Sequence, residues 1–288
     1  MGRTRDAEYS AFQACLNSDT LTLRSKDQFQ RLITKTMSKE DALQEVTQVT
    51  LAAANQTLAT IDTLATSPQG FVRLNLRVPA VRKLTKTPYH FLERSSLSIA
   101  QQWNYIWRNT PYYEVACQAL YYYQHSSLEH HEIKIIQQWI NRCDCWEHSD
   151  DLSKIYTQSI EENPSWLLPT LKQWNQSKNP WKRRQSVVGL IEYASKRQRV
   201  LAFEVLIDSI DNLLADEEYY VQKGLGWTLR EIHNLYPCLT LDYINARLTS
   251  IHPIAYSAAT EKLAPQIKTK LNRIRKDCRQ GLKRKAEQ

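Results

Sequence analysis

The chain has 288 residues, of which 42% are hydrophobic and 24% are charged. This composition supports one large domain or two small ones and excludes a disordered tail. The formal net charge of +8 favours an anionic partner, although charge alone does not separate DNA from RNA or a membrane surface. The longest apolar runs are too short to cross a bilayer, and the polar start lacks the apolar core of a signal peptide, so we expect a cytoplasmic protein with no membrane partner.

Helices are expected almost throughout the sequence. Apolar residues recur at spacings of three and four from about Phe29 to Leu271, and the chain has only six glycines. Prolines stand where new helices can begin, at Pro79, Pro88, Pro111, Pro164, Pro180, Pro237 and Pro265. Successive helices of about 12 to 18 residues with brief connections predict antiparallel pairs in a curved solenoid with a concave face. The predicted fold class is therefore all-α.

Three regions differ in composition. Residues 1–65 are rich in Ala, Thr and Gln and are expected to form an N-terminal helical cap, in which Met37 to Thr63 are compatible with one long helix. Residues 66–265 carry the regular helical pattern and form the predicted repeat domain. Residues 266–288 are strongly cationic and are expected to form a basic C-terminal helix or tail.

The six cysteines show no framework spacing, so we expect free and mostly buried thiols. A possible set of metal ligands consists of Cys143, Asp144, Cys145 and His148. The spacing is C-x-C instead of C-x-x-C, however, and no second pair follows at zinc-finger distance. We therefore predict no metal, and no organic cofactor is indicated either.

Trp146 and Asp150 lie four residues apart, on the side of a predicted helix opposite its apolar stripe. The stripe consists of Leu152, Ile155, Tyr156 and Ile160. An indole ring beside a carboxylate on a polar face suits a cationic ligand or a nucleic acid. The alternative is that the tryptophan packs against a neighbouring helix.

A further helix is expected to start at Pro180, and Arg184 falls on the flank of its apolar stripe. A guanidinium on the buried side of the first helical turn is unfavourable unless an anion lies close to it. Asp150 and a bound phosphate are the two candidates for that anion.

The segment Tyr219 to Tyr236 predicts an amphipathic helix whose polar face carries Lys223, Trp227 and Arg230. Gly224 and Gly226 lie inside this helix, where each glycine costs roughly 1 kcal/mol relative to alanine. Either close packing of another helix or close approach of a ligand explains them.

These segments resemble the AlkD-like DNA alkylation repair glycosylases, which are built from HEAT-like repeats. The resemblance runs from about Leu76 to Pro265 and is most specific over Trp181–Arg184 and Glu217–Glu231. Weaker matches are Leu76–Leu84 and a helix with Trp107, Glu114 and Ala119. The family usually has a tyrosine upstream of Val78–Pro79, whereas Leu64 to Gln69 contains none.

The resemblance implies a cofactor-independent glycosylase that removes N3- or N7-alkylated purines from double-stranded DNA without obligatory base flipping. It implies catalytic roles for Asp150, Trp146, Arg184 and Trp227. Asp150 would stabilise an oxocarbenium-like sugar, the two tryptophans would contact the deoxyribose and the lesion, and Arg184 would hold a phosphate and fix Asp150. A monomer in the cytoplasm, associated with the nucleoid, is expected.

Basic residues suit phosphate contacts that carry no sequence information. We expect Lys182, Arg183, Lys223 and Arg230 to bind DNA, and the run from Lys268 to Lys285 either to do the same or to act as a solvated tail. A non-catalytic helical-repeat protein that binds DNA structures or a protein partner through its concave face is the alternative to the glycosylase. Asp150 favours the enzyme, because a carboxylate is unwelcome where phosphates must approach.

Overall fold

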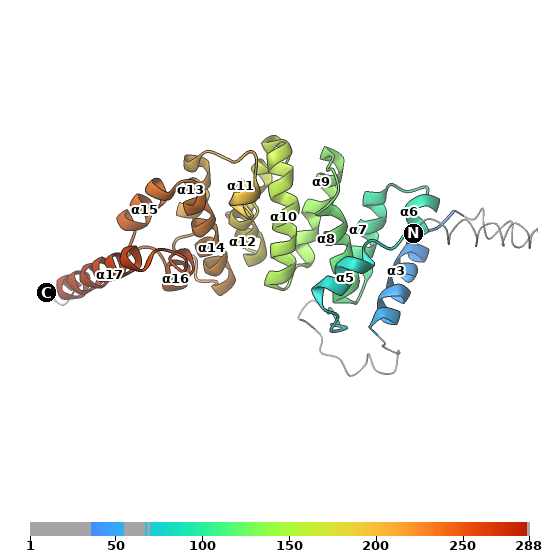
Figure 1. Cartoon of the computed structure of the whole chain (residues 1–288), viewed down its shortest axis with the longest axis horizontal. Helices are drawn as coiled ribbons and strands as arrows, with labels where there is room; N and C mark the ends of the chain where they lie inside the picture. Colours follow the sequence, from blue (N-terminus) through green and yellow to red (C-terminus); the bar gives the residue numbers. More distant parts are fainter. Residues whose placement is uncertain (1–35, 55–66, 68–69, 287–288) are drawn as a thin grey trace, which may run out of the picture.

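The computed structural model describes residues 36–54, 67 and 70–286, and Figure 1 shows their helices following one another along the long axis of the molecule. Within these residues there is no strand, and the extended backbone forms only two isolated bridges, Met37 with Ser95 and Val72 with Tyr112. The predicted all-α class is confirmed. Most of the predicted N-terminal cap lies outside the described residues.

The α-helices in chain order are α3 (Lys39–Ala53), α5 (Val78–Leu84), α6 (Phe91–Arg94), α7 (Ile99–Asn109), α8 (Tyr113–Tyr123), α9 (His130–Ile136), α10 (Trp146–Glu162), α11 (Leu168–Trp174), α12 (Pro180–Val188), α13 (Phe203–Asp211), α14 (Tyr219–Leu235), α15 (Pro237–Ala246), α16 (Pro253–Ala259) and α17 (Pro265–Ala286). Between them lie the 3₁₀ helices η1 (Gln137–Arg142), η2 (Pro164–Trp166) and η3 (Ala194–Lys196).

Most of these helices are shorter than predicted. α5, α9, α11 and α16 have 7 residues each, whereas α10 and α14 reach 17. Prolines in the first turn cut the chain into short pieces, since proline cannot continue a preceding helix, and α9 tightens directly into η1. The predicted helix from Met37 to Thr63 starts after its N-cap Ser38 and ends at Ala53, and residues 55–63 lie outside the described part of the chain.

Aromatic side chains fill the core of the first half of the stack. Trp103, Trp107 and Trp139 are fully buried, and the rings of Trp107 and Trp139 stack with their centroids 5.3 Å apart. Three buried indoles contribute a large share of the apolar area removed from water, which fixes α7 against η1. In the second half, α14 is the central helix: Val221, Leu225, Leu229 and Ile232 are completely buried and form the apolar side of the amphipathic helix predicted from Tyr219 to Tyr236.

A buried carboxylate holds the irregular segment 70–77 on α8. Glu114 accepts hydrogen bonds from the backbone N–H groups of Leu74 at 2.8 Å and Leu76 at 3.3 Å. Burial raises the pKa of the Glu114 carboxyl, although these hydrogen bonds oppose the shift. Trp107 and Glu114, which we expected in one helix, belong to α7 and α8, because Pro111 separates the two.

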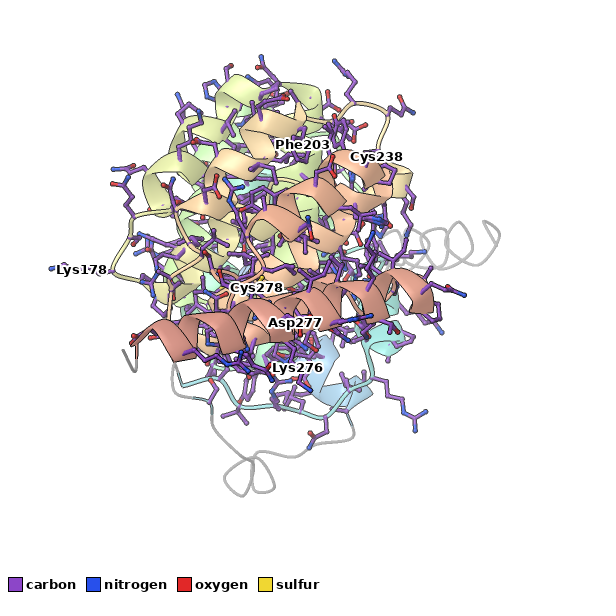
Figure 2. The ribbon with its side chains drawn as sticks, turned by 90° about the vertical axis from the view of Figure 1, so that its left-hand side faces the viewer. Lys178, Phe203, Cys238, Lys276, Asp277 and Cys278 are labelled. Atoms are coloured by element: carbon purple, nitrogen blue, oxygen red, sulfur yellow. The ribbon has the colours of Figure 1, made fainter. Side chains whose placement is uncertain are left out.

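Only the first part of α17 packs on the stack. Arg275 is buried and donates from Nη2 to the Ile251 carbonyl at 2.7 Å, whereas the described side chains that follow it are exposed. Figure 2, which looks along the molecule from this end, shows α17 lying across the stack with Lys276, Asp277 and Cys278 on it. None of the described helices has the length and apolar character needed to span a membrane.

The cysteines only partly follow the prediction. The five described cysteines are free thiols, but only Cys117 and Cys143 are buried. Cys238 and Cys278 are exposed, since they lie on the outer sides of α15 and α17, and Cys145 is intermediate. Cys15 lies outside the described residues.

Candidate functional site

Helices α10, α12 and α14 lie next to one another along the long axis of the molecule (Figure 1). Together with α16 and the residues that follow it, they line a cavity of about 360 Å³. All four residues that we predicted to be catalytic line this cavity. The complete lining is Trp146, Asp150, Arg184, Tyr219, Tyr220, Lys223, Trp227, Arg230, Ala258 and Glu261. Three segments that are distant in sequence therefore converge on one site.

Asp150 lies on α10 and offers the cavity a carboxylate that is both anchored and accessible. Its Oδ1 accepts a hydrogen bond from Arg184 Nη2 at 2.5 Å, and 44% of its side-chain surface remains exposed. Partial burial raises the pKa of the Asp150 carboxyl, and the charge of Arg184 opposes that rise. Of the two anions considered for Arg184, Asp150 is in direct contact with it.

Arg184 is held from three sides. Besides Asp150, its Nη1 donates to the Tyr220 carbonyl at 2.7 Å and its Nε donates to Ser149 Oγ at 3.2 Å. Its side chain is only 5% exposed. A buried guanidinium whose three nitrogen atoms each donate a hydrogen bond is a rigid anchor, so its main effect here is to fix the position of the Asp150 carboxylate.

Close packing accounts for both glycines of α14. A Cβ atom at Gly224 would lie 2.8 Å from Arg184 Nη1, and one at Gly226 would lie 2.3 Å from the Ala255 carbonyl oxygen. Gly224 makes room for α12 and its arginine, and Gly226 makes room for the backbone of α16. The first of the two explanations left open by the sequence is therefore correct.

Exposed aromatic rings surround the carboxylate. Trp146 is 48% exposed on α10, so it does not pack into the core, and Trp227 on α14 is half-buried. Tyr193, whose φ of 48° is uncommon for a non-glycine residue, meets Trp227 edge-on with centroids 6.2 Å apart. Both tryptophans present ring surface to the cavity.

Tyr219 and Tyr220 are cavity residues that our sequence analysis did not assign to the site. They are 52% and 42% exposed, and Tyr220 stacks on Trp181 with centroids 5.3 Å apart. Their signal was present in the sequence, because Tyr219 precedes Lys223 and Trp227 by four and eight residues and thus lies on the same face of the helix. Because Tyr219 and Tyr220 are the first two residues of α14, the sequence alone did not show that they share its cavity-facing side.

The four predicted DNA-binding residues divide into two pairs. Lys223 and Arg230 line the cavity, and Arg230 forms an ion pair with Glu261. Lys182 and Arg183 do not line it. Lys182 lies over the Trp174 ring, with Nζ 5.8 Å from its centroid. A DNA-binding role for these four residues remains a prediction.

Arg183 makes structural contacts within the helical stack. It donates from Nε to Asp216 Oδ2 at 2.5 Å and from Nη1 to the Ser177 carbonyl at 2.8 Å. These contacts tie the start of α12 to the segment that precedes α14.

The fold and the cavity define an all-helical protein that gathers two carboxylates, Asp150 and Glu261, several exposed rings and basic side chains at a single site. The chain belongs to the DNA alkylation repair enzyme family, whose model matches residues 35–263. This match confirms the family resemblance found in the sequence. No curated protein matches the chain at a significant level.

Two solved structures are similar to this chain. A predicted DNA alkylation repair enzyme from Enterococcus faecalis is 19% identical, with a TM-score of 0.55 over 74% of this chain and 96% of its own. AlkD2 from Streptococcus mutans is 16% identical, with a TM-score of 0.47 over 79% of this chain and 100% of its own. At such identities the likeness concerns the fold, and the functional roles of individual residues rest on the site itself.

Proposed function

We propose that this protein is a DNA glycosylase that hydrolyses the N-glycosidic bond of N3- or N7-alkylated purines in duplex DNA. The observation that carries the proposal is the Asp150 carboxylate, which Arg184 fixes in place while 44% of its side-chain surface stays exposed. A carboxylate in this position can face a sugar that becomes positively charged.

The reaction needs little more than electrostatic stabilisation. Alkylation at N3 or N7 gives the purine a positive charge and weakens its bond to C1′ of the deoxyribose. When this bond breaks, its electron pair stays with the base, which leaves uncharged, and the sugar becomes an oxocarbenium cation. Water then adds to C1′ and releases a proton to Asp150 or to solvent. A preorganised charge of this kind contributes about 3 kcal/mol to transition-state stabilisation.

The exposed rings support the binding of a cationic lesion. Trp146 and Trp227 offer electron-rich faces next to Asp150, and such contacts with a cation contribute roughly 0.5 to 2 kcal/mol each. Tyr219 and Tyr220 extend this surface. Trp146 and Asp150 are partly exposed at the protein surface, so a deoxyribose can approach them while its base stays in the duplex. This supports a mechanism in which the base need not be flipped out of the duplex.

We assign the phosphate contacts to Lys223 and Arg230. Lys223 is exposed at the cavity, whereas the Arg184 side chain is only 5% exposed. The Arg230 side chain lines the same cavity, is 14% exposed and must release Glu261 to contact a phosphate. Arg184 therefore acts by positioning Asp150, and the basic residues on α14 hold the DNA backbone.

Base release from methylated duplex DNA tests the proposal. Wild type should release 3-methyladenine or 7-methylguanine, and Asp150→Asn should be slower by about 100-fold, since it keeps the size of the side chain but removes its charge. Glu147→Gln is the matched control, because Glu147 lies on the same helix, pairs with Arg73 outside the cavity and should leave the rate unchanged. Equal release by wild type and Asp150→Asn would refute the mechanism.

The non-catalytic alternative is tested by the same assay. The ion pair with Arg184 gives Asp150 a structural reason to be present even in a protein that only binds DNA or another protein. Absence of base release from wild type, with binding to the DNA intact, would favour this alternative.

A further inference from the structure

A second cluster of chemically versatile side chains lies at the start of α10, outside the cavity. Three atoms lie within 4.8 Å of one another: one carboxylate oxygen of Asp144, the sulfur of Cys145 and one ring nitrogen of His148. His148 is completely buried, whereas Asp144 and Cys145 are partly exposed. The cluster can therefore be reached from solvent.

The imidazole of His148 is unusual because neither ring nitrogen has a hydrogen-bond partner among the described residues. Its surroundings are aromatic: the ring centroids of Tyr113, Trp107 and Phe71 lie 4.5, 5.0 and 5.1 Å away. These rings hold the imidazole in place but offer its nitrogens no partner. A buried polar group without a partner costs about 1–3 kcal/mol, so something else is expected to bind it.

The C-x-C spacing alone led us to expect no metal, but from the arrangement of these side chains we propose that Asp144, Cys145 and His148 bind a zinc ion. Sulfur and imidazole ligands favour zinc over magnesium or calcium, and a thiolate plus a carboxylate balance its two positive charges. Ligand atoms in a tetrahedral zinc site lie about 3.5 Å apart, so ligand atoms that lie up to 4.8 Å apart here must move closer by up to about 1.3 Å when zinc binds. Binding releases the Cys145 proton to solvent, and the fourth position is left for water.

Two arginines near His148 oppose a cation at the cluster: after burial, their charges are the next causes that lower the pKa of the His148 imidazole. Arg73 is balanced by Glu147 at 3.3 Å, whereas Arg142 donates to the neutral Trp107 and Thr110 carbonyls and attracts Asp144. The Asp144 carboxylate and the Cys145 thiolate must therefore offset the charge of Arg142 as well as that of the zinc ion. Cys145 is also the N-cap residue of α10, where the positive end of the helix dipole favours a thiolate, whereas burial raises the pKa of its thiol.

Zinc at this position would clamp the first turn of α10. That turn carries Trp146, and Asp150 follows one turn later, so the ion would hold the wall of the cavity without touching it. The proposal concerns positioning and stability, and it does not depend on the proposed glycosylase activity.

Metal content of the full-length protein is the direct test. After expression with zinc and exhaustive dialysis, we expect about one zinc ion per chain by mass spectrometry. Cys145→Ala and His148→Phe should lose the ion. Cys143→Ala is the control, because this buried thiol is not one of the three ligands. Cobalt should give a sulfur-to-cobalt absorption band in wild type that is absent in Cys145→Ala.

Thermal melting distinguishes a zinc-binding role of His148 from a role in packing alone. Phenylalanine fits among Phe71, Trp107 and Tyr113, so His148→Phe should fold. If zinc is bound, a chelator lowers the melting temperature of wild type and leaves that of His148→Phe unchanged. A wild-type protein without zinc, together with a higher melting temperature for His148→Phe, would overturn the proposal. The ring nitrogens without hydrogen-bond partners would then only destabilise the folded protein.

Discussion

The guanidinium of Arg184 fills the space that a side chain at Gly224 would need. A Cβ at residue 224 would lie 2.8 Å from Arg184 Nη1 and 3.0 Å from Val188 Cγ1. Helices α12 and α14 therefore pack closely at Gly224, and this packing leaves room for Arg184 within reach of Asp150. Helix packing and the geometry of the candidate active site are thus linked at one position.

Gly224→Ala is expected to reduce base release more than it reduces stability. The added methyl group pushes the flexible arginine away from Asp150, while crowding of about 1–3 kcal/mol is partly offset by the higher helix propensity of alanine. Base release and urea unfolding measure the two effects. Gly281→Ala is the control, because a Cβ there meets nothing within 4 Å. Unchanged base release by Gly224→Ala would contradict the link.

The sequence predicted the parts of the site that depend on helical periodicity. Trp146 and Asp150 share a face of α10, and Lys223 and Trp227 share a face of α14, because a period of 3.6 residues fixes such relations locally. The partner of Arg184 required knowledge of how α10, α12 and α14 pack, so the sequence left two candidates. The shortness of the helices depends on tertiary contacts and on prolines, which mark helix starts better than helix ends.

Trp146→Ala should weaken binding and base release with almost no loss of stability. Nearly half of the Trp146 surface is exposed, at 48%, so its removal leaves no cavity in the core. Loss of one ring contact is expected to cost roughly 1–3 kcal/mol in DNA affinity. Fluorescence anisotropy with methylated duplex DNA measures this. Trp166→Ala, which removes a ring stacked on His130, is the comparison and should leave affinity unchanged.

Lys223→Ala should lower the salt dependence of DNA binding. Each phosphate contact contributes close to one unit to the slope of log affinity against log salt concentration, so the slope should fall by about 1. Lys134→Ala is a suitable control, because Lys134 is an exposed lysine on α9 that does not line the cavity. Identical slopes for wild type and Lys223→Ala would remove Lys223 from the DNA interface.

Arg183→Ala should affect folding. The Arg183 and Asp216 side chains are only 18% and 7% exposed, and removing one partner of a buried ion pair costs about 3–5 kcal/mol. Chemical unfolding measures the loss. Lys182→Ala is the neighbouring control and should change stability by less than about 0.5 kcal/mol. A stable Arg183→Ala protein with weakened DNA binding would instead support the role predicted from sequence.

Glu114→Gln should change how stability depends on pH. Burial raises the pKa of Glu114 in the folded protein. In the pH window that begins near the ordinary glutamate pKa of about 4.3, the folded state therefore binds more protons than the unfolded state. The stability of wild type relative to Glu114→Gln is therefore greatest below that window and falls as pH rises, by at most about 1.4 kcal/mol per pH unit. Because glutamine does not titrate, the difference between the two unfolding free energies isolates this one group from the other carboxylates. Unfolding in urea across the window measures it, and a difference that does not vary with pH would show that the Leu74 and Leu76 hydrogen bonds fully offset the cost of burial.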